Sequence, residues 1–291
     1  MRNLSETRLS RCRKNLFAFI SLLVLILVTY SNTFNASWHF DDRNNILKNT
    51  PLHLTEPNLK NINKTFFADL KDTEKLYRPV ACFSFALNYY FGETRVFGYH
   101  LINLIIHFLA AFFLYLFIDS TLNLPLIRDK YGANSYFIAL LATILWTINP
   151  VQTQAVTYIV QRMASIAGLF YIAAMFFYLK GRTSKQRSAM FLWYVLCFFS
   201  GSLAFGSKEN AIMLPISILL FDLFLIQGIS RKTLTRFFFS LLLTVGICLV
   251  IALLLEGPSL FNLPDLSAIN HNRGFSLGQR LLTEARVILF Y

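Results

Sequence analysis

The chain has 291 residues, of which 55% are hydrophobic and only 14% are charged. A soluble domain carries about 25% charged residues, so this composition excludes a single soluble core. The formal net charge of +12 would favour nucleic acid as the partner of a soluble protein. In a membrane protein, basic cytoplasmic segments and anionic lipid head groups account for such a charge, and we expect no nucleic-acid partner.

The apolar residues form blocks of roughly 20, the length at which a helix crosses a hydrocarbon layer of about 30 Å. The blocks lack the alternation of barrel strands, so the fold class expected is an all-α polytopic membrane protein. The expected spans, in chain order, are 16–30, 98–118, 135–148, 163–179, 189–205, 211–227 and 237–255. The block at 135–148 is short and can extend on either side. Residues 281–291 read as the start of an eighth span, cut off by the chain end.

The N-terminal segment 1–15 is basic and precedes the first apolar block. It can belong to a signal peptide or to an uncleaved anchor; no small-residue cleavage site follows, which favours the anchor. After the first span comes a long loop, 31–97, with little helical periodicity before residue 76. Its apolar stretch 78–92 is too short for a span and predicts an interfacial or re-entrant helix.

The basic residues predict the orientation of the spans. The segments 1–15, 119–134, 180–188 and 228–236 together hold 14 Lys and Arg residues. The two short turns on the other side hold one each, Arg162 and Lys208. Because basic loops stay cytoplasmic, the N-terminus is expected inside and the loop 31–97 outside.

The polar side chains that can do chemistry gather on the expected outer side. Asp41 and Asp42 follow the first span, and His100, Asn103 and His107 share one helical face by their spacing. The other candidates on this side are Arg78, Gln152, Gln154, Arg162, Lys208 and Glu209. A carboxylate can act as general base on a hydroxyl, and cations at head-group level can bind a phosphate.

Each candidate also has a structural interpretation. The Asp pair can be a solvated loop or a helix cap, and the His–Asn–His face can be a hydrogen-bonded seam between helices. Arg162 can anchor to head groups, and Lys208 and Glu209 can pair with each other or cap helix ends. The joint position of these residues on one side favours a functional site, although spacing alone does not separate group transfer from lipid-phosphate transport.

Several segments resemble a known family. They are HFDDRNNI (39–46), YRPVACFSFALNYYFG (77–92), GYHLINLIIH (98–107), NPVQTQAVTYIVQRMASIAGLFY (149–171) and GSKENAIMLPISILLFD (206–222). In this order they resemble the membrane portion of the transmembrane and tetratricopeptide-repeat-containing proteins and their bacterial relatives, members of the GT-C glycosyltransferase superfamily. The resemblance covers about residue 15 to the chain end. It implies a GT-C-type helix bundle over 16–291, with tetratricopeptide repeats following residue 291.

The resemblance also implies roles. The donor would be a polyprenyl- or dolichyl-phosphate sugar, with no nucleotide sugar, and the acceptor a protein hydroxyl or a glycan. Asp41, ahead of Asp42, matches the catalytic base, while Arg78, Arg162 and Lys208 match positions expected to contact the donor phosphate. Family members often have His-Pro where this sequence has Asn149-Pro150, which puts any role of that His in doubt. The residues predict no metal site. A divalent cation that accompanies the donor is compatible with them.

The leading hypothesis is therefore a membrane glycosyltransferase that moves a hexose, mannose-like, from the lipid phosphate with inversion on the non-cytoplasmic face. One alternative is a non-catalytic membrane scaffold that anchors a repeat domain. Another is a lipid-linked sugar transporter, which would need polar residues along a path through both leaflets. The inner halves of the spans offer little beyond Ser and Thr, and Asp222 is the main exception. The composition and short loops favour a bacterial cytoplasmic membrane, with the endoplasmic reticulum membrane as the alternative.

Overall fold

The computed structural model describes residues 4–70, 75–256 and 277–290. These described residues form helices joined by turns, without a strand. By its internal contacts the chain divides into two units, Met1–Thr233 and Leu234–Tyr291, and each is described by itself.

Five helices among the described residues are long and apolar enough to cross a membrane. The first four lie in α1 (Leu4–Thr29), α4 (Val96–Leu122), α8 (Arg162–Thr183) and α9 (Arg187–Phe205). The fifth, Glu209–Gln227, is built from the short helix η6 (Glu209–Met213), α10 (Leu214–Phe221) and η7 (Asp222–Gln227). The chain is therefore an all-α, multi-pass integral membrane protein, as its composition predicts.

The expected span at 135–148 does not extend. Helix α6 (Ser135–Thr147) has 13 residues, or about 20 Å, and it follows the short elements α5 (Arg128–Tyr131) and η4 (Gly132–Asn134). It ends before Asn149-Pro150, because proline disfavours the helical conformation of the residue before it. Asn149 Oδ1 then accepts the backbone N–H of Val151 at 3.0 Å and fixes the turn. Helix α7 (Gln152–Thr157) and η5 (Ile159–Gln161) lead on to α8.

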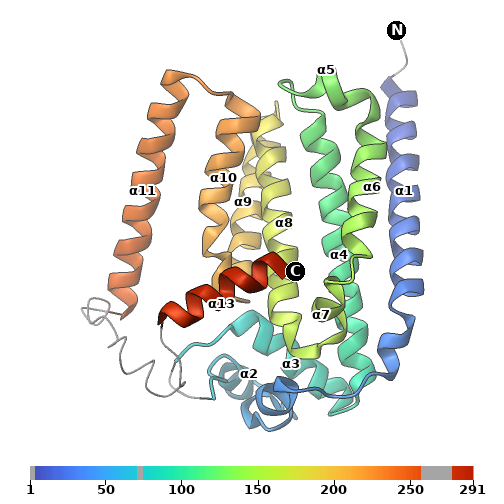
Figure 1. The fold of residues 1–291 in the computed structure, drawn as a ribbon, viewed down its shortest axis with the longest axis vertical. Helices are drawn as coiled ribbons and strands as arrows, with labels where there is room; N and C mark the ends of the chain where they lie inside the picture. Colours follow the sequence, from blue (N-terminus) through green and yellow to red (C-terminus); the bar gives the residue numbers. More distant parts are fainter. Residues whose placement is uncertain (1–3, 71–74, 257–276, 291) are drawn as a thin grey trace. The chain divides into compact units, whose positions relative to one another are not determined.

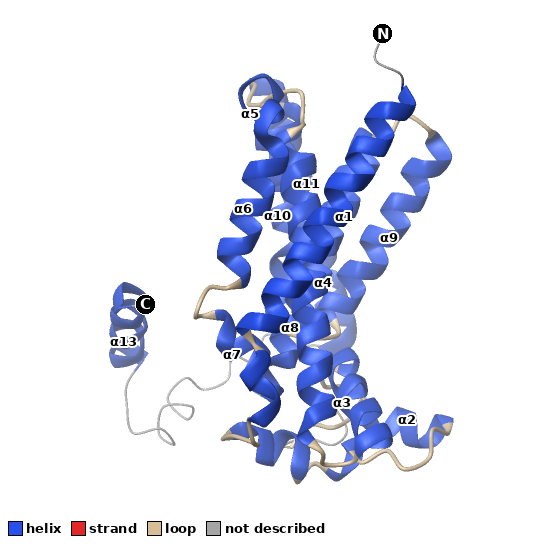
Figure 2. Ribbon diagram, turned by 90° about the vertical axis from the view of Figure 1, so that its right-hand side faces the viewer, coloured by secondary structure: helices blue, strands red, loops and turns tan. Residues whose placement is uncertain are grey.

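The first loop contains more helix than the sequence predicts. Before residue 76 it forms η1 (Ser31–Asn35), η2 (Arg43–Leu47), η3 (Thr50–Leu52) and α2 (Leu59–Thr65). The expected short helix is α3 (Pro79–Gly92), whose 14 residues, about 21 Å, cannot cross the hydrocarbon layer. In the first unit, α2 and α3 lie at the opposite end of the bundle from α5 and the start of α1 (Figures 1 and 2).

Helix α8 packs against both α4 and α9. Its buried small residues Ala167, Ala173 and Ala174 let neighbouring backbones approach closely, which is how membrane helices associate without a hydrophobic drive between them. At the α3 end of the bundle, an apolar cluster includes Phe85, Tyr99 and Met163. This cluster fixes the first loop to the helices that bear the candidate site.

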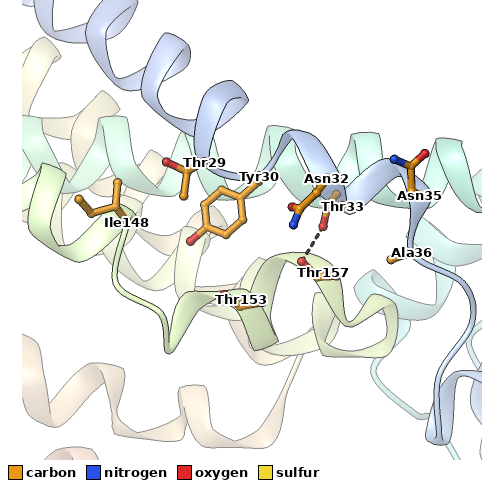
Figure 3. Close-up of a pocket in the computed structure, with 9 residues that line it drawn as sticks. All are labelled: Thr29, Tyr30, Asn32, Thr33, Asn35, Ala36, Ile148, Thr153 and Thr157. Carbon is orange, nitrogen blue, oxygen red and sulfur yellow. Dashed lines mark hydrogen bonds between the residues drawn. The ribbon is translucent and has the colours of Figure 1, made fainter.

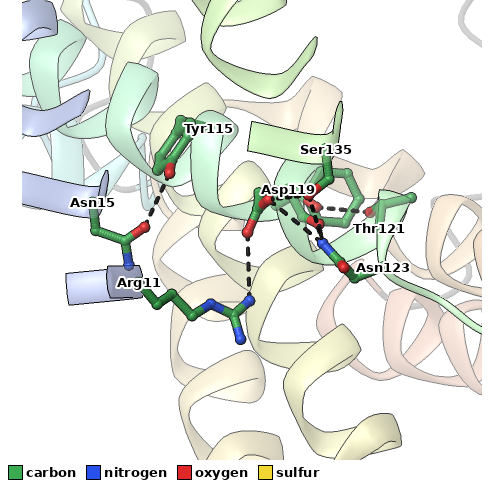
Figure 4. A network of polar contacts seen from close by, with 8 residues as sticks. Arg11, Asn15, Tyr115, Asp119, Thr121, Asn123 and Ser135 are labelled. Carbon is green, nitrogen blue, oxygen red and sulfur yellow. Dashed lines mark hydrogen bonds and ion pairs between the residues drawn. The ribbon is translucent and has the colours of Figure 1, made fainter. Parts of the chain in front are cut away.

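A polar network closes the other end of the first unit (Figure 4). Arg11 pairs with Asp119 at 3.4 Å, and Ser135 Oγ donates to the Asp119 carboxylate at 2.8 Å. Asn123 donates to Ser135 Oγ at 2.9 Å. The expected cytoplasmic segments 1–15 and 119–134 thus meet at one end of the bundle. On which side of the membrane this end lies stays a prediction.

The second unit holds most of α11 (Arg231–Glu256), and α13 (Leu277–Phe290). The expected span 237–255 falls inside α11. The expected start of an eighth span, 281–291, lies on helix α13 except for residue 291, which is outside the described residues, and it stays a prediction. Its sequence interleaves Arg280, Glu284 and Arg286 with apolar residues, a pattern typical of an amphipathic helix.

Candidate functional site

Asp41 and Asp42 have different environments. Asp42 is fully buried and anchors two segments: its Oδ2 accepts the N–H of His39 at 3.0 Å, and its Oδ1 accepts the N–H of Val160 at 2.7 Å. Burial raises the pKa of Asp42, and the two backbone hydrogen bonds act in the opposite direction. Asp41 is exposed, and its backbone N–H donates to the Tyr158 hydroxyl at 3.0 Å. Asp42 is therefore suited to hold the turn, and Asp41 to meet a substrate.

The turn that carries Asp41 is strained. Phe40 has φ of +37° although it is not glycine, and its side chain is 87% exposed. Such a conformation costs of order 1 kcal/mol or more and persists where the surroundings fix it. The hydrogen bonds of Asp42 to His39 and Val160 supply that fixation.

The predicted polar face of α4 exists, and it is buried. Each of its three side chains contacts a backbone carbonyl of another segment: His100 Nε2 with Ala36 at 3.0 Å, Asn103 Nδ2 with Val156 at 3.1 Å, and His107 Nε2 with Thr147 at 3.1 Å. Val156 and Thr147 lie in the last turns of α7 and α6, where helix carbonyls lack partners within their own helix. The face therefore joins α4 to the first loop, to α7 and to the end of α6, in agreement with its structural interpretation.

Arg162 has no exposed surface. Its Nε donates to Asn103 Oδ1 at 2.6 Å, its Nη1 to Asn88 Oδ1 at 2.5 Å and to Ser84 O at 3.3 Å, and its Nη2 to Tyr99 O at 2.8 Å. The guanidinium also lies 4.7 Å from the centre of the Phe85 ring. In this geometry Arg162 braces α3, α4 and α8 together, and its contact with a donor phosphate stays a prediction.

Arg78 and Lys208 meet at the junction of α3 with η6. Arg78 forms a two-pronged ion pair with Glu209, with Nε–Oε1 and Nη2–Oε2 distances of 2.9 and 2.8 Å. The Glu209 side chain is 66% exposed, so the pair is open to solvent. Burial and the neighbouring Arg78 lower the pKa of Lys208. Two cations and one carboxylate thus share a solvent-accessible junction, whereas Arg162 is enclosed.

The remaining candidates are less constrained. Gln152 and Gln154 lie on α7, where Gln154 is exposed and Gln152 is half-buried. Among the residues that the structure describes, no group of three His, Cys, Asp or Glu could hold a metal ion.

A cavity of about 340 Å³ lies between the segment after α1 and helix α7. Figure 3 shows Asn32 and Thr33 on one wall and Thr153 and Thr157 on the other. The Thr33 and Thr157 hydroxyls are 2.5 Å apart and join the two walls. Thr29, Tyr30, Asn35, Ala36 and Ile148 complete the lining, so no charged side chain contributes.

The chain is similar in sequence to several animal proteins that share one name. The chain is 31% identical over 209 residues to the protein O-mannosyl-transferase F38B6.6 of Caenorhabditis elegans, covering 70% of this chain and 27% of that protein. It is 28% identical to TMTC3 of Mus musculus (73% and 22% covered) and to tmtc2 of Xenopus laevis (77% and 27% covered). All three are named protein O-mannosyl-transferases.

This chain spans only 22% to 27% of the length of these O-mannosyl-transferases. They support the resemblance to transmembrane and tetratricopeptide-repeat-containing proteins. They are animal proteins, which weighs against the expected bacterial relative. No family model matches the chain, and no solved structure matches it.

Sequence reasoning missed Tyr158, Asn88 and Asp119. Tyr158 holds the backbone of Asp41, Asn88 accepts from Arg162, and Asp119 organises the polar network at the other end. A single asparagine inside the apolar stretch 79–92 was a usable signal, because an amide buried among apolar residues needs a partner. Tyr158 carried no such signal, since a tyrosine at a membrane surface is common.

Proposed function

We propose that this chain is the membrane portion of a protein O-glycosyltransferase of the transmembrane and tetratricopeptide-repeat-containing family. It transfers a hexose, mannose-like, from a polyprenyl or dolichyl phosphate to a protein hydroxyl on the non-cytoplasmic face. The O-mannosyl-transferase relatives support sugar transfer to protein. The observation that carries the proposal is the exposed Asp41 carboxylate on a turn that the buried Asp42 fixes.

The residues divide the reaction between them. Asp41 removes the proton of the acceptor hydroxyl, whose oxygen attacks the anomeric carbon of the sugar. The bond between that carbon and the phosphate oxygen breaks, the lipid phosphate leaves, and in-line displacement inverts the anomeric centre. Arg78 and Lys208 stabilise the charge on the leaving phosphate. A divalent cation that accompanies the donor remains compatible with this arrangement.

The animal origin of the relatives supports the endoplasmic reticulum membrane rather than the bacterial cytoplasmic membrane as the location of this protein. In that membrane the non-cytoplasmic face is the lumen. The loop 31–97 and the site of Asp41 would then meet lumenal protein acceptors.

The test compares Asp41→Asn with the unchanged protein in membranes supplied with labelled polyprenyl-phosphate hexose and a protein acceptor. The variant keeps the shape of the side chain and loses its basicity, so transfer should fall at least ~100-fold with insertion unchanged. Asp129→Asn, an exposed aspartate at the α5 end, is the matched control and should retain full transfer. Full transfer by Asp41→Asn would refute Asp41 as the base, whereas no transfer by the unchanged protein would favour the scaffold alternative.

A further inference from the structure

The cavity between η1 and α7 differs chemically from the junction of Arg78 and Lys208. Its lining consists of threonine, asparagine and tyrosine side chains with Ala36 and Ile148, and none of these carries a charge. A phosphate placed there would find no cation. A neutral ligand that both donates and accepts hydrogen bonds fits the lining.

Four polar side chains of the lining are available to such a ligand. Tyr30 donates to Thr147 O at 2.9 Å, and Thr33 and Thr157 bond each other, so these hydroxyls are already engaged. The side chains of Thr29, Asn32, Asn35 and Thr153 are exposed and have no hydrogen-bond partner among the described residues. An asparagine amide presents one acceptor and two donors, which matches the N–H and C=O of an extended peptide backbone.

Both walls of the cavity continue directly into the candidate site. The wall 29–36 leads to the turn of Asp41, and the wall 153–157 leads to Tyr158, whose hydroxyl accepts the Asp41 N–H at 3.0 Å. The Thr33–Thr157 contact and the bond from Val160 N–H to Asp42 hold the two segments together on either side of this junction. A chain bound in the cavity would therefore lie beside the segments that carry Asp41 and Tyr158.

We propose that this cavity is the acceptor subsite and binds an extended, uncharged peptide segment next to the serine or threonine that receives the sugar. This proposal rests on the proposed function and assigns the acceptor, one of its two substrates, to the cavity. A volume of about 340 Å³ falls at the lower end of ligand pockets, enough for about two residues. Asn32, Asn35 and Thr153 bind the peptide backbone, and the neutral lining selects against charged neighbours of the hydroxyl.

The test uses the full protein in membranes and a double variant, Asn32→Leu with Thr153→Val. Both substitutions keep the approximate shape and remove hydrogen-bonding groups. The acceptor-peptide KM should rise about ten-fold or more, while kcat and the donor KM stay unchanged. The matched control combines Asn134→Leu and Thr50→Val, two exposed positions that do not line the cavity, and should leave all three constants unchanged.

An unchanged acceptor KM in the double variant, or a rise in the donor KM instead, overturns the acceptor subsite. A second readout separates this failure from failure of the proposed function. A threonine peptide with a diazirine side chain is photo-crosslinked to the unchanged protein in the absence of donor. Crosslinks to segments 29–36 and 153–157 support the subsite even if no sugar is transferred, and their absence overturns it even if transfer occurs.

Discussion

At the scale of single residues, the two adjacent aspartates differ in what surrounds them. Asp42 uses both carboxylate oxygens on backbone N–H groups of separate segments, and Asp41 projects from the turn that these bonds fix. In the proposed function, Asp42 anchors the turn and Asp41 contacts the substrate.

The first prediction concerns Asp42→Asn. An asparagine has one acceptor oxygen, so one of the N–H groups of His39 and Val160 would face an amide nitrogen. The loss should lower the free energy of unfolding by about 1–3 kcal/mol, and thermal unfolding in detergent measures it. Asp41→Asn is the control and should unfold at the temperature of the unchanged protein. Equal stability of the two variants would contradict the anchoring role of Asp42.

The second prediction concerns Arg162. Arg162→Lys retains the charge, but an ammonium cannot reach Asn103, Asn88 and Tyr99 from one position as the planar guanidinium does. The free energy of unfolding should fall by at least ~2 kcal/mol, because buried hydrogen-bond acceptors lose their donors.

Arg95→Lys provides the control, because Arg95 is exposed and, among the described residues, its side chain donates one hydrogen bond, to Gly92 O at 3.3 Å. It should leave stability unchanged. A variant Arg162→Lys with normal stability but no transfer would instead favour direct contact between Arg162 and the donor phosphate.

At the scale of elements, the packing of α8 on α9 depends on the absence of a side chain at Gly181. A Cβ at this position would lie 2.8 Å from Cε1 of Tyr194, closer than carbon atoms pack. The glycine thus allows the aromatic ring of one helix to contact the backbone of the other.

The third prediction is that Gly181→Val destabilises the protein by about 1–3 kcal/mol, because the two helices must separate or the ring must move. Gly168→Ala on the same helix is the matched control. No atom lies within 4 Å of its added Cβ, so alanine should be neutral or slightly stabilising. Adding Tyr194→Ala to Gly181→Val should restore part of the lost stability; no restoration would show that the ring is not the obstacle.

At the scale of the whole molecule, the prediction to test is the orientation of the first unit in the membrane. Cys12 is exposed at the end that bears the Asp119 network, and Leu59 is 88% exposed at the end that bears α2 and α3. In sealed vesicles of known orientation, a membrane-impermeant thiol reagent should reach Cys12 from the cytoplasmic side. It should reach Leu59→Cys only from the opposite side, and labelling of both from one side would refute the alternating topology.

Much of this arrangement was predictable from the sequence, because apolar length is a strong signal. The five long apolar helices and the short helix Pro79–Gly92 fall where the hydropathy places them. The common face of His100, Asn103 and His107 followed from helical spacing alone. The short helices before residue 66 could not be predicted from the sequence, because they depend on contacts with other segments. One such contact is the hydrogen bond that Asn49 Nδ2 donates to Ala68 O at 2.8 Å.

The sequence predicts which residues belong to the candidate site, but it does not predict how their environments differ. The expected spans place Arg78 and Arg162 on the same side, yet they do not show that one is open to solvent and the other enclosed. That difference arises from Asn88 and Ser84, which lie 74 and 78 residues before Arg162 along the chain. Hydrogen bonds between residues so far apart along the chain produce no periodic pattern in the sequence.

The hydrogen bonds of Arg162 bear on how the protein is made. Every acceptor of its guanidinium, Ser84, Asn88, Tyr99 and Asn103, is synthesised before Arg162 itself. A charge that enters the bilayer without partners costs ~2.5–3.5 kcal/mol on insertion scales. Here the segments that carry the partners have already been synthesised when the arginine is added to the chain. The N-terminal part of the chain can therefore serve as a template on which α8 inserts, and a polypeptide lacking residues 84–103 should insert this helix poorly.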